Sequence, residues 1–93
     1  MSSPLSRSEI EDALEELDGW SYEDDRLVKT FTFEDFQSAM GFIVRVGFLA
    51  EDAGHHPELE NVYDTVTLAF TTHDAGGKVT RKDVDIAHEI EAI

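Results

Sequence analysis

Two adjacent histidines, His55 and His56, stand between a glycine and a proline in the segment GHHP. Neighbouring side chains point in different directions, so a tandem pair is a poor way to fill a hydrophobic core. A third histidine, His73, follows a strongly alternating segment, and Glu51 lies about one helical turn before His55. We expect these four side chains to converge on one cleft.

Three kinds of chemistry suit such a group. Imidazole titrates near pH 6.5, so a positioned histidine can give and take protons and typically contributes a factor of about 10² to 10⁴ in rate. Histidine and glutamate also bind zinc or iron, although two adjacent histidines rarely reach the same ion. A His-His-Pro turn could instead only complement the dipole at a helix C-terminus. The spacing favours acid–base catalysis and leaves the other two interpretations open.

The first helix and hairpin are signalled by local motifs. Ser6 and Glu9 form a capping box that predicts a helix start, Ser8 and Glu11 form a rival box two residues later, and Gly19 predicts the helix end. The segment WSYEDDRLVKTFTF then predicts a hairpin that turns at Asp24 and Asp25. Its single tryptophan, Trp20, is expected in the core.

A second helix is predicted from about Glu34, with Thr32 as its N-cap and Asp35 at its third position. Its apolar residues recur at helical spacing: Phe36, Ala39, Met40, Ile43, Gly47 and Ala50. Gly54 predicts a left-handed end, and Pro57 prevents further helix. The histidine pair should therefore lie on a short rigid turn just past a helix C-terminus.

Two strands follow this turn. We predict a short strand near residues 58–62, a tight reversal around Tyr63 and Asp64, and a longer strand to about Thr72. Val66, Leu68 and Phe70 are expected on the buried face of that strand. His73 is expected to end it on the opposite face.

The last helix is predicted after Thr80, with Asp83 at the capping-box position. Its buried edge should consist of Val84, Ala87 and Ile90. The resulting order is α-β-β-α-β-β-α, which predicts an α+β fold: a four-stranded antiparallel sheet with three helices packed on one face. A chain of 93 residues should form a single domain over residues 1–93.

The chain is very acidic. Its 21 acidic against 7 basic residues give a formal charge of −14, which disfavours nucleic acid and anionic membrane as partners. Such an excess with few lysines is typical of proteins from salt-accumulating halophiles. The absence of cysteine excludes disulfides and thiolate metal sites. No segment has the pattern of a membrane span or of a signal peptide, so we expect a cytoplasmic protein.

The spaced motif Glu51-x-x-x-His55-His56-Pro57, followed by Tyr63, His73 and Asp83, resembles the signature of the pterin-4a-carbinolamine dehydratase family. The resemblance covers nearly the whole chain. It includes Gly19-Trp20 and the segments FTFEDFQSAM, HHPELENVY and TTH. The family has the same order of elements as the one predicted above.

The resemblance implies removal of water from a 4a-hydroxytetrahydropterin to give the quinonoid dihydropterin, which supports recycling of a pterin cofactor. Expelling hydroxide requires a general acid, and a ring nitrogen must lose a proton, so histidines suffice. No metal and no cofactor of the enzyme is implied. The resemblance makes His55, His56 and His73 the catalytic residues. His56 would be the principal acid, His73 could also protonate the leaving hydroxyl, and His55 would bind the pterin or take the ring proton.

Three further residues are candidates for substrate binding by the same resemblance. Glu51 would hold either a histidine or the pterin. Tyr63 would either line the pterin pocket or fill the corner of the hairpin. Asp83 would contact the site or serve only as a helix cap, which by itself explains its presence.

The family also suggests partners. Its members form dimers and tetramers by joining sheets and packing helices, so we expect a homodimer or homotetramer that binds a small pterin. The alternative function is a non-catalytic pterin-binding or dimerisation module, in molybdopterin metabolism or as a regulatory partner. Such a module has no need of all three histidines, so the enzyme is the preferred interpretation.

Overall fold

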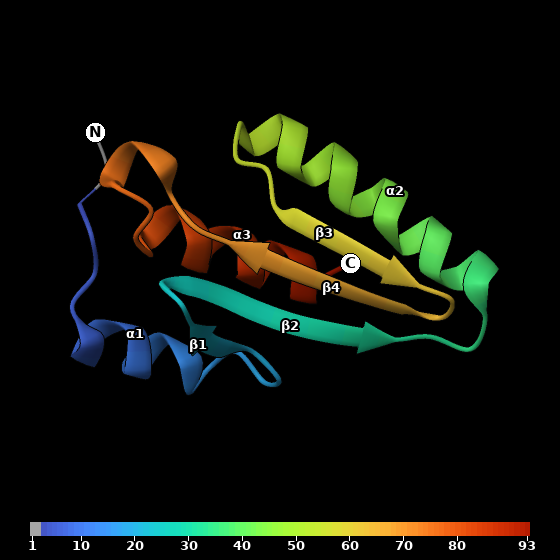
Figure 1. Ribbon diagram of the computed structural model, residues 1–93, viewed down its shortest axis with the longest axis horizontal. Coiled ribbons are helices and arrows are strands. Elements are labelled where there is room, and N and C mark those ends of the chain that lie inside the picture. The colour runs from blue at the N-terminus through green and yellow to red at the C-terminus, as the bar shows by residue number, and fades with distance from the viewer. Residues whose placement is uncertain (1–2) are drawn as a thin grey trace.

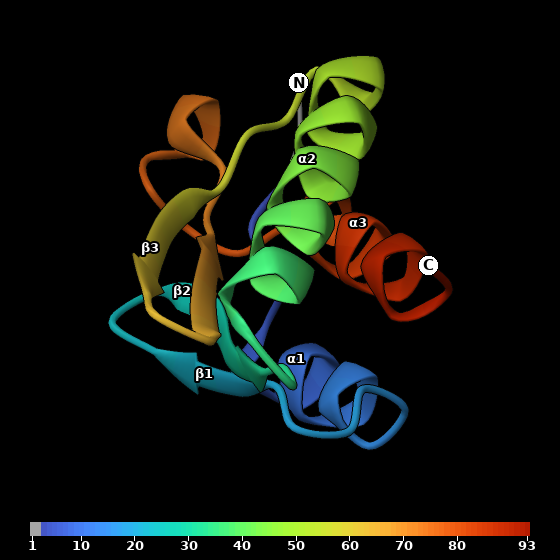
Figure 2. The same ribbon diagram turned by 90° about the vertical axis from the view of Figure 1, so that its right-hand side faces the viewer.

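A four-stranded antiparallel sheet with three helices on one of its faces forms the fold in the computed structural model, which describes residues 3–93 (Figure 1). Figure 2 shows the three helices together on one side of the sheet. The strand order is β1-β2-β4-β3. This confirms the predicted α+β fold and element order. The elements are α1 (Arg7–Leu14), β1 (Ser21–Glu23), β2 (Arg26–Thr32), α2 (Phe36–Ala53), β3 (Glu58–Val62), β4 (Thr65–Phe70), the 3₁₀ helix η1 (His73–Ala75) and α3 (Arg81–Glu91).

Two tight turns connect neighbouring strands of the sheet, one between β1 and β2 and one between β3 and β4. Asp24 and Asp25 both have left-handed backbone angles, with φ of 51° and 61°, and they join β1 to β2 where the sequence predicts a turn. The predicted reversal between β3 and β4 is also present, and Val62 pairs there with Thr65. At the other end of this hairpin Glu58 pairs with Ala69. The start of β3 and the end of β4 therefore lie side by side, which brings the histidine turn next to the residues after β4.

The core lies between the sheet and the helices. Val66, Leu68 and Phe70 on the central strand β4 are each 0% exposed, as the alternation predicts. They pack in one cluster with buried residues from α1, α2, α3, β2 and the connecting segments: Ile10, Ala13, Leu17, Trp20, Leu27, Ala39, Val46, Ala50, Val79, Val84, Ile86, Ala87 and Ile90. Burial of this apolar surface is the main source of stability.

Trp20 is buried at 6% exposure, which confirms its expected place in the core. Its indole N–H donates to the Glu91 carboxylate at 2.9 Å, and Lys29 Nζ lies 2.8 Å from the same oxygen. Burial alone would raise the pKa of Glu91, but the hydrogen bonds from Lys29 and Trp20 outweigh it and leave that pKa below its usual value. The end of α3 is thus fixed to the sheet.

Helix α1 begins as predicted and ends earlier. Ser6 is the N-cap and forms the capping box with Glu9. The regular helix stops at Leu14, so the prediction of Gly19 as its end is wrong by about one turn. Single-turn hydrogen bonds continue the chain, such as Leu17 N–H to the Leu14 carbonyl at 3.2 Å, and they keep Leu17 buried.

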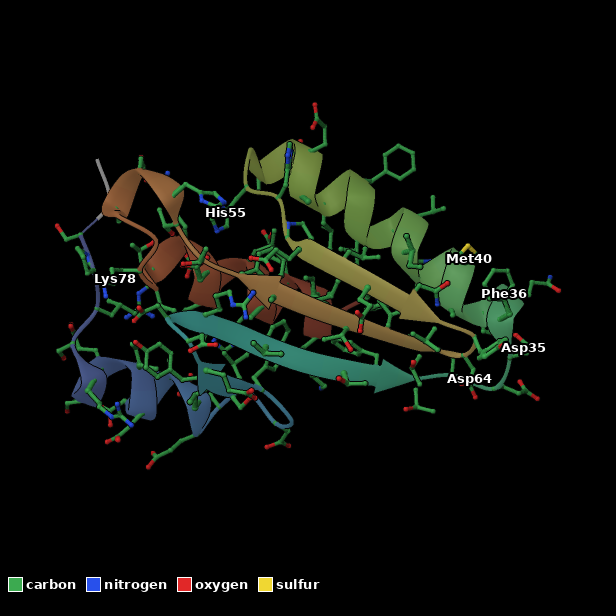
Figure 3. All side chains as sticks on the ribbon, viewed as in Figure 1. Asp35, Phe36, Met40, His55, Asp64 and Lys78 are labelled. Atoms are coloured by element: carbon green, nitrogen blue, oxygen red, sulfur yellow. The ribbon has the colours of Figure 1, made fainter. Side chains whose placement is uncertain are left out.

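Helix α2 starts later than predicted. Its N-cap is Asp35, whose side chain accepts from the Ser38 N–H at 2.7 Å. Thr32, the predicted N-cap, instead pairs with Thr65 at the end of β2. The sheet ladder therefore extends through Thr32, and the helix begins only after the cap at Asp35. Asp35 and the adjacent Phe36 are labelled in Figure 3.

The buried side of α2 differs from the predicted apolar stripe at two positions, because Phe36 and Gly47 are both exposed. Ala39 and Ala50 are buried, as expected, and Val46 joins them. Phe36 is 54% exposed and therefore does not belong to the buried face. Phe36, Val44 and Phe48 form an exposed apolar row, called here the outer row of α2. No helix within residues 3–93 is long and apolar enough to cross a membrane.

The predicted left-handed end of α2 at Gly54 is confirmed, with a φ of 63°. Replacing Gly54 with alanine should lower the free energy of unfolding by about 1 kcal/mol, because a Cβ disfavours this conformation. Gly47→Ala is the matched control inside α2, and it should raise the same free energy by about 0.5–1 kcal/mol. An added Cβ meets no atom within 4 Å at either position, so only the backbone differs. Urea unfolding measures both, and effects of equal sign would contradict this account.

Candidate active site

A cleft of about 510 Å³ opens where the turn after α2 meets the segment after β4. Its volume is in the range of small-molecule sites. Residues 54–58 form one wall, Ala69 and residues 71–74 form another, and Lys82 from α3 completes the lining. All three histidines of the sequence motif, His55, His56 and His73, lie in this lining.

The turn that carries the tandem histidines is fixed by the end of α2. Gly54 reverses the chain, and the His55 N–H donates to the Ala50 carbonyl at 3.0 Å. The two imidazoles then diverge. The His55 side chain is only 12% exposed, whereas that of His56 is 64% exposed. Adjacent residues therefore present one buried and one exposed imidazole to the same cleft.

His55 is held between an aromatic ring and a carboxylate. Its imidazole stacks on Phe70 with ring centroids 5.8 Å apart and an angle of 25° between the planes. Its Nε2 lies 2.6 Å from Asp83 Oδ1 at the start of α3. Figure 3 shows His55 between the end of α2 and the strands below it. These contacts fix the orientation of the ring.

Asp83 has the predicted position in a capping box with Thr80, and it is 0% exposed. Its Oδ2 accepts from the Thr80 N–H at 2.9 Å and from the Thr72 hydroxyl at 2.8 Å. Asp83 is not part of the cleft lining, so it reaches the cleft through His55 rather than by direct contact. The cap and the histidine contact use different oxygens of one carboxylate.

His56 pairs with Glu51, although the helical spacing in the sequence relates Glu51 to His55. The His56 Nε2 lies 3.0 Å from Glu51 Oε1, and the Glu51 side chain is 82% exposed. Two roles were possible for Glu51, to hold a histidine or to hold the pterin, and this contact corresponds to the first. The pair is open to solvent, unlike the pair of His55 and Asp83.

His73 reaches the cleft from a different element than predicted. Strand β4 ends at Phe70, and His73 is the first residue of the 3₁₀ helix η1, so its placement at the end of the strand is wrong. Thr72 forms an isolated bridge with Lys78 instead, and this bridge closes the loop. Gly76 and Gly77 close the loop with positive φ of 77° and 73°. His73 is exposed at the rim of the cleft.

Tyr63 lies away from the histidines. It occupies the tip of the hairpin between β3 and β4, with φ of 52° and 81% exposure. His56 precedes β3 and Tyr63 follows it, so about 20 Å of extended strand separates them. Tyr63 is absent from the cleft lining of this chain. A contact of Tyr63 with substrate stays a prediction.

Three charged residues of the cleft were not singled out from the sequence. Glu58, Asp74 and Lys82 line it, and Lys82 Nζ lies 4.0 Å from Asp74 Oδ2. Each is adjacent in sequence to a motif residue, and that adjacency is the signal that could have found them. The fourth histidine, His88, is exposed on α3 outside this lining. Within residues 3–93 no group of three or more potential ligands is arranged for a metal ion.

The site therefore offers one buried imidazole–carboxylate pair, one exposed pair and a third imidazole at the rim. An imidazole paired with a carboxylate is held in one orientation. Imidazole can both donate and accept a proton, so several imidazoles on one cleft can act on the same bound molecule. The arrangement suits transfer of protons to and from a bound molecule.

Known proteins resemble this chain over its whole length. The sequence model of the family described as "Pterin 4 alpha carbinolamine dehydratase" matches residues 3–93. A protein of Opitutus terrae, named "Putative pterin-4-alpha-carbinolamine dehydratase", is 52% identical over 93 residues, which cover 100% of this chain and 96% of that one. A protein of the same name from Roseiflexus sp. is 48% identical and is covered to 99%.

A solved structure has the same fold. The crystal structure of a protein from Brucella melitensis, described as a transcriptional coactivator/pterin dehydratase, matches with a TM-score of 0.91 and 36% identity. The match covers 97% of each chain. This chain belongs to the pterin-4-alpha-carbinolamine dehydratase family. It is accordingly an enzyme of the hydro-lyase class, which eliminates water from its substrate.

Proposed function

We propose that this protein removes water from a 4a-hydroxytetrahydropterin by histidine general acid–base catalysis and forms the quinonoid dihydropterin. The observation that carries the proposal is the convergence of His55, His56 and His73 on one cleft. The names of the relatives support the substrate class.

His56 is the general acid in this proposal. The C4a–O bond breaks, and the proton of the His56 imidazolium passes to the departing hydroxide, which leaves as water. The Glu51 carboxylate at 3.0 Å from Nε2 orients the His56 ring at the cleft. His73, at the opposite wall, can protonate the same hydroxyl.

His55 is the residue that binds the pterin or takes the proton from its ring nitrogen. Asp83 stabilises the positive charge that His55 gains when it accepts that proton, at a distance of 2.6 Å. The low exposure of both side chains strengthens this interaction relative to one in water. Asp83 acts through His55 and supports it as a positioning residue.

Self-association belongs to the same proposal. Phe36, Val44 and Phe48 of the outer row of α2 are between 54% and 75% exposed. An exposed apolar row is typical of a surface that packs against another chain. We propose that a second copy of this chain covers it, in a homodimer or homotetramer.

The test is dehydration of freshly generated 4a-hydroxytetrahydropterin, followed by ultraviolet absorbance. Wild-type protein should remove water faster than the spontaneous reaction in buffer alone. Parallel measurements in low and molar potassium chloride show whether the charge of −14 must be screened for activity. A folded protein that gives only the spontaneous rate at both salt concentrations would refute the dehydratase proposal and favour the non-catalytic module.

A further inference from the structure

A buried chain of hydrogen bonds lies behind His55. Thr72, Thr80 and Asp83 are 2%, 0% and 0% exposed. Thr72 Oγ1 lies 2.8 Å from Asp83 Oδ2 and 2.7 Å from Thr80 Oγ1. No water competes for these groups at such burial, so each contact needs a hydrogen from one of the two partners. This requirement allows the hydrogens to be placed.

The placement starts at the carboxylate. Asp83 Oδ2 accepts from the Thr80 N–H and contacts the Thr72 hydroxyl, as an ionised carboxylate does. The single hydrogen of Thr72 must therefore point to Asp83. The Thr80 hydroxyl must then donate to Thr72, and its oxygen remains free to accept from the Lys82 N–H at 3.2 Å. Each hydrogen in this series of hydrogen bonds therefore has a single possible position.

The same assignment of hydrogens to donors and acceptors determines the tautomer of His55. Asp83 Oδ1 is an acceptor, so the 2.6 Å contact requires a hydrogen on His55 Nε2. Neutral His55 then has its lone pair on Nδ1. This nitrogen has no hydrogen-bond partner within residues 3–93, and Arg26 Nε is the one buried unpaired side-chain nitrogen or oxygen in that range. The Nδ1 atom is therefore accessible from outside the protein.

We infer that Thr72 is a positioning residue for the reaction: its hydroxyl orients Asp83, which fixes the Nε2–H tautomer of His55 and leaves Nδ1 as the proton acceptor. The inference rests on the proposed function for its catalytic part. Thr72 itself is held in place, because its N–H donates to the Lys78 carbonyl at 3.0 Å and its carbonyl accepts from Gly77 at 3.1 Å. Thr72 thus joins the end of the sheet to the start of α3 at the point where His55 docks.

The test replaces Thr72 with valine, which has nearly the same shape and no hydroxyl. Loss of the donor should lower kcat about tenfold, the order of one buried hydrogen bond to a charged group, with KM unchanged. Thr72→Ser keeps the hydroxyl and should restore kcat. Thr30→Val is the matched control, because Thr30 also bonds a threonine hydroxyl, at 2.9 Å, but is exposed and lies outside the cleft lining.

A second measurement does not depend on catalysis. Nitrogen-15 NMR of the histidine rings reports which nitrogen of neutral His55 carries hydrogen. Wild-type protein and Thr72→Ser should show the Nε2–H form, and Thr72→Val should show a mixture of the two tautomers. An Nδ1–H form in the wild type, or an unchanged tautomer together with an unchanged kcat in Thr72→Val, would overturn the inference. If the wild type has no activity at all, the proposed function fails and the NMR comparison still decides the role of Thr72.

Discussion

Replacing His56 with alanine is expected to lower kcat for dehydration by a factor of about 10² to 10⁴, the usual contribution of a positioned general acid. The variant keeps the cleft but loses the proton donor that Glu51 holds at 3.0 Å. Its stability should change little, because the His56 side chain is 64% exposed. The absorbance assay described above measures the rate.

His88→Ala is the matched control for this experiment. His88 is also an exposed histidine near a glutamate, with Nε2 at 4.0 Å from Glu16, but it lies on α3 outside the lining of the cleft. The control should keep the wild-type kcat. Equal losses in the two variants, or full activity of His56→Ala, would show that His56 is not the acid.

Replacing Phe70 with alanine is expected to lower the free energy of unfolding by about 3–5 kcal/mol. Phe70 is 0% exposed on the central strand, and its ring packs 6.3 Å from that of Trp20 and 5.8 Å from the imidazole of His55. Domains of this size have a total stability of about 5–15 kcal/mol, so the loss is a large fraction of the whole. Chemical denaturation followed by tryptophan fluorescence measures it.

Tyr63→Ala is the control for that measurement. It removes an aromatic ring of similar size from a residue that is 81% exposed, so the free energy of unfolding should change by no more than about 0.5 kcal/mol. A loss at Tyr63 comparable to that at Phe70 would mean that the hairpin tip is covered in solution. A small effect at Phe70 would contradict its place in the core.

Local signals predicted most of the fold. The capping boxes at Ser6 and Thr80 are correct because each depends on contacts within four residues. The alternation along β4 is correct because one face of the central strand must be buried. The left-handed end at Gly54 is correct because few other residues adopt that conformation without strain.

Two of the wrong boundaries, the start of α2 and the end of β4, share a cause outside the local sequence. Thr32 has the chemistry of an N-cap, but its pairing with Thr65, which follows it by 33 positions, keeps it in the sheet. His73 follows an alternating segment, but the ladders of β4 end where Leu27 pairs with Phe70 and Glu58 pairs with Ala69, so the strand stops before it. Such competitions are decided by tertiary pairing, which sequence periodicity does not contain.

The contacts of the candidate site also differ in how far the sequence predicts them. The sequence places Glu51 one helical turn before His55, whereas the folded chain pairs it with His56, beyond the left-handed turn at Gly54. The contact of His55 with Asp83 spans 28 positions and exists only in the folded chain. From the sequence alone, Asp83 was sufficiently explained as a helix cap. The fold adds the second role by placing the start of α3 beneath the end of α2.

The unequal burial of His55 and His56 predicts which histidines would be substituted first in a lineage that loses the activity. His56 and His73 are exposed, so a lineage released from selection for catalysis can exchange them freely. His55 is tied to Asp83 and Phe70, and its replacement damages the fold itself. In such a lineage, substitutions should therefore appear first at His56 and His73, whereas His55 and Asp83 should be retained. A descendant that retains His55 and Asp83 but has lost His56 and His73 would be recognisable as a relative that keeps the fold without the activity of the enzyme.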